Sequence, residues 1–261
     1  MDHRQAGRYW ESSALAWTRL ARQGWDVYRD AVNTPAFLAL LPAVAGKRGL
    51  DIGCGEGHNT RLFAERGARM CGIDIAPTFV RFAAEMERAQ PHGIHYAVAS
   101  ALELPFASGA FDFVTAVMSL MDVPDHALAL SEIHRVLRAG GFLQFSITHP
   151  CFSPPHRRLL RTEQGQAYAV EVGRYFETVD GRIDRWLFSA APEEAKAGVR
   201  PFELPVFHRT LAEWLNAVIQ AGFMLERVVE PKADDDTAQR VPAVEDTRVV
   251  AYFLHLLCRK R

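Results

Sequence analysis

The chain has 261 residues, of which 49% are hydrophobic, so it is long enough to bury a full core as one elaborated domain or two small ones. Thirty Lys and Arg residues nearly balance 31 Asp and Glu residues, and the formal net charge of -1 argues against a nucleic-acid-binding surface. No apolar run approaches the roughly 18 residues that a membrane span requires.

Residues 1–45 are predicted to form an N-terminal helical lid. The chain starts with a polar stretch of mixed charge, which is unlike a secretory signal, and its four cysteines are scattered without a CxxC pair. We therefore expect a cytoplasmic protein without disulfides. Trp10, Trp17 and Trp25 recur at helical spacing, which predicts that they share one helical face, and a short apolar helix is expected over 36–45.

Residues 46–148 are predicted to form a core in which strands and helices alternate. The expected strands are Gly49–Ile52, Met70–Asp74, Ile94–Val98, Phe111–Met118 and Phe142–Ile147. The expected helices are Asn59–Arg66, Pro77–Ala89 and His126–Arg138, with Gly140-Gly141 at the end of the last, where a helix favours positive φ. Alternating strands and helices predict a parallel sheet with helices on both faces.

Residues 149–207 interrupt this alternation, because they are rich in Pro, Arg and aromatic residues and lack a clean periodicity. A segment of this length inside a compact domain is usually functional, and we expect a cap that holds substrate. Over 208–261 the alternation returns with a helix at Leu211–Ala221 and two apolar strands, Met224–Val229 and Val249–Leu257. No helix is expected between these strands, which predicts an antiparallel hairpin at a sheet edge.

The fold predicted for the whole chain is a single domain of the α/β class. Its doubly wound, mostly parallel seven-stranded sheet lies in three α/β/α layers and carries the cap insertion and the antiparallel C-terminal hairpin. The acidic residues Asp234–Asp236 fall between the last two strands. Such carboxylates can bind a metal cation, but we interpret them as a solvated hairpin turn and predict no metal site.

A glycine-rich loop follows directly on the first strand of the core. It reads Gly53-Cys54-Gly55-Glu56-Gly57, and three alternate glycines let the backbone turn sharply and let a ligand approach it closely. Asp74 ends the next strand, at the position that meets the ribose of a bound nucleoside in doubly wound folds. The loop and this aspartate together indicate a nucleoside site.

Two residues favour S-adenosylmethionine over NAD as the nucleoside. The dinucleotide fingerprint G-x-G-x-x-G would need a third glycine where this chain has His58. Glu56 would also lie beside a pyrophosphate, and like charges about 4 Å apart at an effective dielectric near 20 repel by roughly 4 kcal/mol. S-adenosylmethionine carries a sulfonium and an ammonium instead, and the Glu56 carboxylate would attract these positive charges. An NAD-dependent oxidoreductase and a non-catalytic cofactor-binding protein stay open as alternatives.

These motifs resemble those of the class I S-adenosylmethionine-dependent methyltransferases of the broad small-molecule group, from about Leu50 to Ile147. The resemblance is carried by Leu-Asp-Ile-Gly-Cys-Gly-Glu-Gly at 50–57, by Gly-Ile-Asp-Ile-Ala at 72–76, by Leu104-Pro105-Phe106 with Phe-Asp-Phe-Val at 111–114, and by 132–141. It implies a Rossmann-like fold and methyl transfer from S-adenosylmethionine, which leaves as S-adenosylhomocysteine, to an O, N or C atom of a small-molecule acceptor.

The resemblance also implies which residues bind the cofactor, from the methionyl part through the ribose to the adenine. Asp74 would take the ribose and Ile75 would pack on the adenine, while Ser100 stands where the family often has Asp and makes a weaker adenine contact. The full implied set is Asp51, Gly53, Cys54, Gly55, Asp74, Ile75, Ser100, Ala101, Leu102, Met118 and Ser119.

His149 is the candidate general base. It follows the fifth predicted strand at the carboxyl edge of the sheet, where ligands bind, and imidazole takes up protons near neutral pH. A histidine that only hydrogen-bonds a loop carbonyl beside Pro150 would give the same pattern.

Further aromatic residues and a second histidine are candidates for binding the acceptor. The candidate substrate residues are Tyr9, Trp10, Phe152, Tyr175 and His208. Tyr9 and Trp10 could instead pack their helix on the sheet, and the segment at His208 could serve a helix that Thr210 caps. As partners we expect a small-molecule acceptor, no nucleic acid and no membrane, and as assembly state a monomer or a homodimer.

Overall fold

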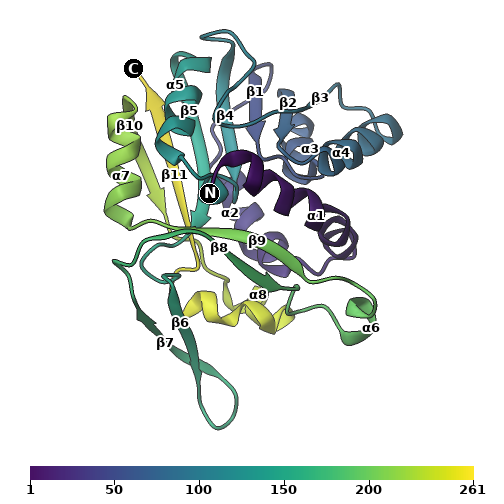
Figure 1. Ribbon diagram of the computed structural model, residues 1–261, viewed down its shortest axis with the longest axis vertical. Coiled ribbons are helices and arrows are strands. Elements are labelled where there is room, and N and C mark those ends of the chain that lie inside the picture. Colours follow the sequence, from purple (N-terminus) through teal and green to yellow (C-terminus); the bar gives the residue numbers. More distant parts are fainter.

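A seven-stranded sheet lies at the centre of the computed structural model, which describes residues 1–261 (Figure 1). Its strand order is β10-β11-β5-β4-β1-β2-β3. The parallel strands of the core are β1 (Arg48–Ile52), β2 (Arg69–Asp74), β3 (His95–Val98), β4 (Phe111–Val117) and β5 (Leu137–Thr148). β11 (Phe253–Lys260) runs antiparallel between β5 and the edge strand β10 (Phe223–Val229). The predicted fold class is confirmed.

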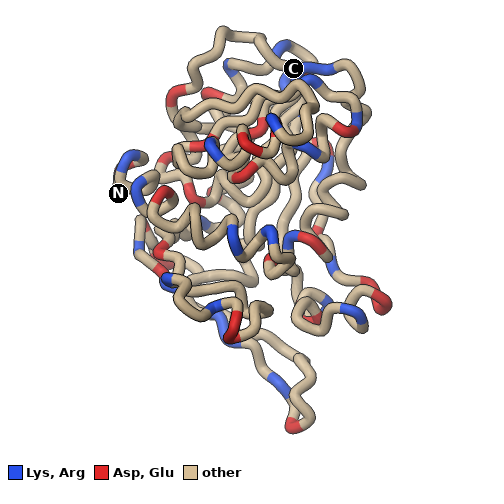
Figure 2. Tube along the Cα trace, turned by 90° about the vertical axis from the view of Figure 1, so that its right-hand side faces the viewer, with Lys and Arg blue, Asp and Glu red and all other residues tan.

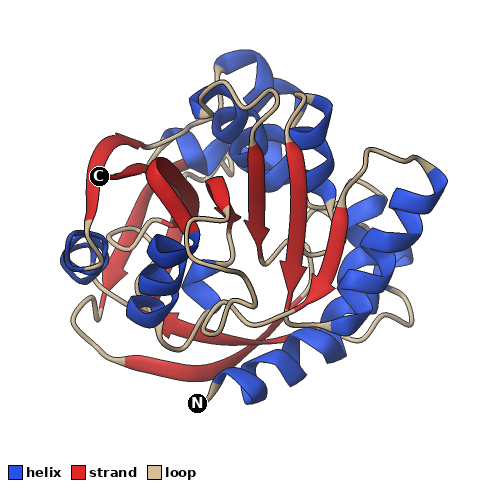
Figure 3. Ribbon diagram, turned by 90° about the horizontal axis from the view of Figure 1, so that it is seen from above, coloured by secondary structure: helices blue, strands red, loops and turns tan.

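Helices cover both faces of the sheet, as the view from above shows (Figure 3). On one face α2 (Thr34–Leu40) and α3 (His58–Glu65) bury Phe37 and Phe63. On the other face α5 (His126–Val136) and α7 (Leu211–Gln220) bury Ile133 and Trp214. α4 (Pro77–Ala89) begins at Pro77, whose fixed φ suits a first helical turn, and it matches the predicted bounds.

The N-terminal segment is a long helix followed by a break. α1 (His3–Arg22) starts with a capping box, in which the Asp2 carboxylate accepts the Gln5 N–H at 2.8 Å and the Gln5 side chain accepts the Asp2 N–H. The helix ends before Gly24, which has φ of +84°. A short π-helix, Arg29–Asn33, then leads into α2. The prediction that Trp25 shares a helical face with Trp17 is therefore wrong.

The cap contains regular strands that the sequence pattern did not predict. β6 (His156–Arg161) and β7 (Ala167–Gly173) form a hairpin that projects from the body of the molecule (Figure 1). β8 (Val179–Trp186) pairs antiparallel with β9 (Phe202–His208), and α6 (Glu193–Lys196) lies between them. β9 reaches one residue past the predicted end of the cap, and α1 packs against it.

The acidic residues 234–236 begin a helix, so the prediction of a hairpin turn there is wrong. The Asp234 carboxylate accepts the Thr237 N–H at 2.7 Å and caps α8 (Asp235–Arg240). A 3-10 helix, Pro242–Arg248, follows. This helical connection delays the last strand, which starts at Phe253 rather than at Val249.

Gly140-Gly141 also has a different role from the predicted one. α5 ends at Val136, and Gly140, with φ of +72°, lies in an irregular start of β5, where the partners of Phe111 and Phe113 jump from Leu137 to Phe142. The helix end is satisfied elsewhere in the chain, because the Lys260 ammonium donates to the carbonyls of His134 and Leu137 at 2.6 and 2.7 Å.

Basic and acidic side chains are interspersed over the surface (Figure 2). None of the helices combines the length and the apolar character that crossing a bilayer would take.

Candidate functional site

The glycine loop between β1 and α3 is folded by positive φ angles and by hydrogen bonds to the end of β2. Gly53, Gly55 and Gly57 have φ of +67°, +56° and +84°. The Cys54 N–H donates to the Ile73 carbonyl at 2.9 Å, and the Gly55 N–H donates to the Asp74 carboxylate at 2.9 Å. A Cβ built on Gly55 would meet no atom within 4 Å. The loop therefore leaves open space over Gly55, where a ligand can approach the backbone.

Asp51 is the residue before the last of β1, Asp74 ends β2, and both side chains are buried. Asp51 accepts hydrogen bonds from Thr60 of α3 at 2.6 Å and from Thr115 of β4 at 2.8 Å. Asp74 accepts the N–H groups of Gly55 and Ala76, each at 2.9 Å. Burial raises the pKa of Asp51 to about 6 and that of Asp74 to about 6, although these hydrogen bonds oppose the rise. A cationic ligand would favour their charged forms.

Glu56 does not present its charge to a ligand. Its side chain is buried and forms ion pairs with Arg22 of α1 at 3.0 Å and with Arg61 of α3 at 3.3 Å. Two arginines thus neutralise the carboxylate that the sequence analysis placed beside a pyrophosphate. The charge argument against NAD fails for this reason, and Glu56 instead ties α1 to the loop.

The end of β4 turns sharply toward the loop. Met118 has φ of +54°, and its N–H donates to both the carbonyl and the hydroxyl of Ser146 on β5, at 3.0 and 3.2 Å. The Ser119 hydroxyl donates to the Ile52 carbonyl at 2.6 Å. A Cβ on Gly53 would lie 2.3 Å from the Ser119 Cβ. Ser119 therefore lies against the loop, as the resemblance implies.

The expected adenine side is covered by α1. A Cβ on Gly7 would lie 2.9 Å from Cγ1 of Ile75, so the helix backbone packs directly on that side chain. Ser100 uses its hydroxyl within its own turn, where it accepts the Leu102 N–H at 3.1 Å. Ala101 and Leu102 are partly buried against the main core. α1 therefore forms one wall of the expected adenine side.

His149 is buried, and both of its ring nitrogens have partners. Nε2 lies 2.8 Å from a carboxylate oxygen of Glu230, and Nδ1 accepts the Cys151 N–H at 3.2 Å. Because Nδ1 accepts, Nε2 carries the proton and donates to Glu230. Phe152 packs against the ring in a tilted arrangement, with 4.7 Å between centroids. Both predicted residues thus lie together at the junction of β5 and the cap, among these partners.

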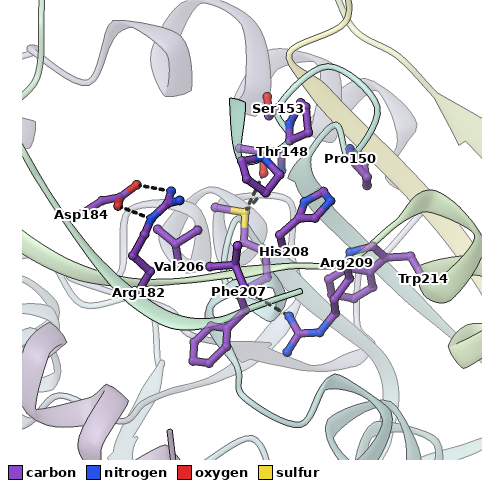
Figure 4. A pocket seen from close by; sticks show the side chains of 14 residues that line it. Thr148, Pro150, Ser153, Arg182, Asp184, Val206, Phe207, His208, Arg209 and Trp214 are labelled. Atoms are coloured by element: carbon purple, nitrogen blue, oxygen red, sulfur yellow. Dashed lines mark hydrogen bonds and ion pairs between the residues drawn. The ribbon is translucent and has the colours of Figure 1, made fainter. Parts of the chain in front are cut away.

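A cavity of about 150 Å³ lies between the end of β5, the start of the cap and the β8–β9 hairpin (Figure 4). Thr148 lines it from the end of β5 and Met121 from the 3-10 helix Leu120–Asp122 after β4. From the cap it is lined by Pro150, Ser153, Pro154 and Pro155. Its polar side chains come from Thr148, Ser153, Arg182, Asp184, His208 and Arg209. His149 is not among the lining residues. The cavity lies beyond the carboxyl ends of β4 and β5, where ligands bind in α/β sheets.

The predicted substrate residues fall into two groups. Tyr175 and His208 lie together, because the His208 Nε2 is 2.7 Å from the Tyr175 carbonyl. Thr210 caps α7 with Glu213 in a capping box, and the Tyr175 hydroxyl accepts the Leu211 N–H at 2.8 Å. Tyr9 and Trp10 lie on α1, away from the cavity, and Trp10 packs on Phe79 at 6.3 Å between centroids.

Several residues of the site gave no signal in the sequence. Glu230 reaches His149 from the end of β10, and Arg22 reaches the glycine loop from α1. Arg182 and Asp184 form a two-bond ion pair on β8 that lines the cavity, at 2.9 and 3.1 Å. Each contact joins segments far apart in the chain or neighbours on one face of an unpredicted strand. Spacing alone therefore could not identify them.

Comparison with known proteins places the chain among methyltransferases. Residues 50–145 match the Methyltransferase domain family. The chain is 30% identical over 216 residues to an uncharacterised protein of Haemophilus influenzae, covering 79% of this chain and 78% of that protein. It is 33% identical over 153 residues to the O-methyltransferase cnsE of Penicillium expansum, covering 56% of this chain and about half (53%) of that relative.

A solved structure extends the likeness to three dimensions. The crystal structure of an S-adenosylmethionine-dependent methyltransferase from Mesorhizobium loti superposes with a TM-score of 0.68 at 28% sequence identity. The superposition covers 87% of this chain and 96% of that one, so it extends well beyond residues 50–145.

Proposed function

Because this chain belongs to the class I S-adenosylmethionine-dependent methyltransferases, we propose that it methylates a small molecule held in the cavity under the β8–β9 hairpin. The acceptor atom is an oxygen, nitrogen or carbon. The likeness to an O-methyltransferase supports oxygen as one of these.

One observation carries the proposal: a single short segment joins the glycine loop to the cavity. Ser119 touches Gly53 and hydrogen-bonds the Ile52 carbonyl, and Met121, two residues further on, lines the cavity. The two places are therefore adjacent beyond the carboxyl ends of β1 and β4. This arrangement suits a reaction in which a donor on the loop meets an acceptor in the cavity.

The residues present fit an S-adenosyl group. The open space over Gly55 admits the methionyl part, and the buried carboxylates of Asp51 and Asp74 suit its ammonium and the ribose hydroxyls. When bound, the cofactor supplies a methyl group on a sulfonium, which is already a good leaving group. The protein mainly has to align the acceptor with that methyl and exclude water, and alignment alone can contribute roughly 7–11 kcal/mol.

The base role of His149 remains a prediction. Its Nδ1 would have to exchange the Cys151 N–H for a proton of the acceptor, while Glu230 holds the Nε2–H in the manner of a carboxylate that orients a catalytic imidazole. The present contacts support a second role, in which His149 anchors the first turn of the cap to Glu230. Substitution by Gln separates the two, because turnover should fall with unchanged cofactor affinity only if His149 takes the proton.

Calorimetric titration with S-adenosylmethionine and S-adenosylhomocysteine tests the proposed function directly. We expect saturable binding of both, followed by transfer of a deuterated methyl group to one or a few small molecules of a cell extract, read by mass spectrometry. Absence of binding at millimolar concentration would refute the proposal. Binding without transfer to any extract component would refute methylation and leave a cofactor-binding protein.

A further inference from the structure

His149 and His208 lie at the two ends of the cap, but only His208 lines the cavity. The His149 ring is buried, lies outside the cavity lining and has both nitrogens engaged. The His208 ring lines the cavity, and only its Nε2 has a protein partner. Its Nδ1 bonds to no protein atom and is not one of the buried polar atoms that lack a partner, so it is accessible. Figure 4 shows this ring in the middle of the cavity, between Thr148 and Arg209.

The Tyr175 carbonyl fixes the tautomer of His208. A carbonyl oxygen only accepts, so at 2.7 Å the His208 Nε2 must carry the proton and donate it. The neutral ring then has its lone pair on Nδ1. Tyr175 is itself held, because its hydroxyl accepts the Leu211 N–H at the start of α7. A base that a third group holds in one orientation is the usual arrangement for proton transfer at an active site.

The cavity also presents polar side chains to a ligand. Thr148, Arg182, Asp184 and Arg209 line it together with His208. Binding pockets use a small number of such polar groups to orient a ligand, so this lining favours a ligand with a polar group. A volume of about 150 Å³ accommodates a benzene-sized group. Because the cavity opens to solvent, this volume describes the part of the ligand that enters it, which is about one ring in size and polar.

We infer that His208, through Nδ1, is the base that removes the proton of the acceptor, and that the acceptor places a ring-sized group with a hydroxyl or N–H in the cavity. The inference rests on the proposed function. As the acceptor heteroatom bonds to the methyl carbon, the carbon–sulfur bond breaks and its electrons pass to sulfur, which becomes a neutral thioether. The acceptor proton passes to His208 Nδ1, and the imidazolium later releases it to water. A carboxylate or thiolate acceptor would not need this base.

The first test needs no acceptor. Diethyl pyrocarbonate reacts with accessible, unprotonated imidazole nitrogens, and peptide mass spectrometry locates the product. In the free protein we expect His208 to be modified and the buried His149 and His255 to be spared. Modification of His149 with protection of His208 would overturn the inference.

The second test compares variants with deuterated-methyl S-adenosylmethionine and the small-molecule fraction of a cell extract. His208→Gln keeps an N–H for the Tyr175 carbonyl but removes the lone pair of Nδ1. We expect it to slow labelling by about 10²–10⁴-fold, the usual contribution of a general base, with S-adenosylhomocysteine affinity within twofold of wild type. His156→Gln is the matched control, because His156 pairs with Glu171 on the exposed β6–β7 hairpin.

The outcomes separate the two claims. Wild-type labelling that persists within threefold in His208→Gln would overturn the role of His208 while the proposed function stands. If His149→Gln slows labelling by about 10²–10⁴-fold and His208→Gln does not slow it, the base is His149 instead. Failure of the wild-type protein to bind S-adenosylmethionine would refute the proposed function itself. If His208→Gln does not fold, His208→Asn and the pyrocarbonate result on the wild-type protein decide the point.

Discussion

Gly53 and Gly55 have similar backbone angles but different surroundings. Both lie in the left-handed region, with φ of +67° and +56°. A Cβ at Gly53 would lie 2.3 Å from the Ser119 Cβ, whereas one at Gly55 would meet nothing within 4 Å. The first glycine is thus required by packing inside the protein. The second is required only by its positive φ and by any ligand that occupies the open space. A substitution at Gly55 therefore tests whether a ligand binds there.

Gly55→Ala should therefore cost cofactor affinity far more than stability. Alanine at positive φ costs roughly 1–2 kcal/mol in the free energy of unfolding, and the added methyl fills the space proposed for the methionyl part. Gly93→Ala is the matched control, since Gly93 has φ of +77° and equally empty surroundings in an exposed loop. Urea unfolding should show similar losses for both variants, while calorimetry should show at least tenfold weaker S-adenosylmethionine binding (about 1.4 kcal/mol) only for Gly55→Ala. Equal affinities would contradict this placement of the cofactor.

The buried aspartates predict that cofactor affinity depends on pH. In the free protein burial raises the pKa of Asp51 and of Asp74 to about 6, and a cationic methionyl group favours the ionised carboxylate beside it. Binding at low pH must therefore displace protons, so affinity should rise from about pH 5 to about pH 7 and then level off. Calorimetry in buffers of different ionisation enthalpy would detect the released protons. Asp51→Asn should flatten the curve, and an unchanged curve would refute the assignment.

The same pKa values predict that the stability of the free protein falls as pH rises, whereas cofactor affinity rises. The folded state of the free protein holds these protons more tightly than the unfolded chain, whose aspartates titrate near their usual value of about 3.9. Between about pH 4 and pH 6 the folded protein binds more protons, so its free energy of unfolding should fall as pH rises through this window. Urea unfolding across this range checks the direction.

Local contacts made the cofactor residues recognisable from sequence, and distant contacts hid the rest of the site. Asp74 bonds Gly55 and Ala76, which belong to the motif itself. His149 donates to Glu230, and His208 owes its tautomer to the Tyr175 carbonyl; no spacing rule connects either partner with its histidine. A sequence reveals that a histidine is present at the sheet edge. Which nitrogen it offers is decided by the tertiary fold.

At the scale of elements, the central strands were predictable because they are buried, and the β6–β7 hairpin was not because it is exposed. Most of β4 and the Phe142–Ile147 part of β5 are buried and appear as apolar runs in the sequence. β6 has no buried residue, and its faces alternate only between exposed and half-buried. A hairpin with no buried face has no reason to alternate apolar and polar residues, so periodicity cannot detect it.

The misread segment after β10 did contain a helix signal. Asp234 stands at an N-cap position, acidic residues fill the first turn and Arg240 occupies the last turn. The helix has only six residues, which is too short to show an apolar face. The N-cap residue and the charges in the first and last turns were therefore the only helix signals. A cluster of acidic residues suggests a solvated turn equally well.

Trp17 of α1 lies at the centre of an aromatic cluster with residues of the β8–β9 hairpin. Trp17 lies 4.8 Å from Phe188, 4.9 Å from Phe202 and 5.5 Å from Trp186, measured between ring centroids. Trp17→Ala should lower the free energy of unfolding by about 3 kcal/mol, because it empties the centre of this cluster. Leu15→Ala on the same helix is the control, since Leu15 is 63% exposed and should change stability by less than about 0.5 kcal/mol. If urea unfolding shows a similar loss of free energy of unfolding for Trp17→Ala and Leu15→Ala, the cluster does not hold the hairpin.

At the scale of the molecule, α1 connects the glycine loop with the hairpin over the cavity. Its Arg22 pairs with Glu56 of the loop, and its Glu11 accepts the N–H and the hydroxyl of Thr78 at the start of α4. Its Ser13 hydroxyl accepts the Glu203 N–H of β9 at 3.1 Å. One helix therefore contacts both the glycine loop and the β8–β9 hairpin. Reduced motion of the loop on ligand binding can reduce the motion of the hairpin through this helix.

Cofactor binding should therefore order β9 as well as the loop. Addition of S-adenosylhomocysteine should slow amide hydrogen exchange in the loop, in α1 and in β9, while the β6–β7 hairpin, which projects from the body, stays unchanged. In Arg22→Met, which removes the ion pair but leaves Arg61 on Glu56, the loop should still be protected and the protection of β9 should shrink. Protection confined to the loop in the wild-type protein would contradict the coupling. Equal protection of β9 in the wild-type protein and in Arg22→Met would show that the coupling does not depend on Arg22. It would then pass through another contact of α1, such as that of Gly7 with Ile75.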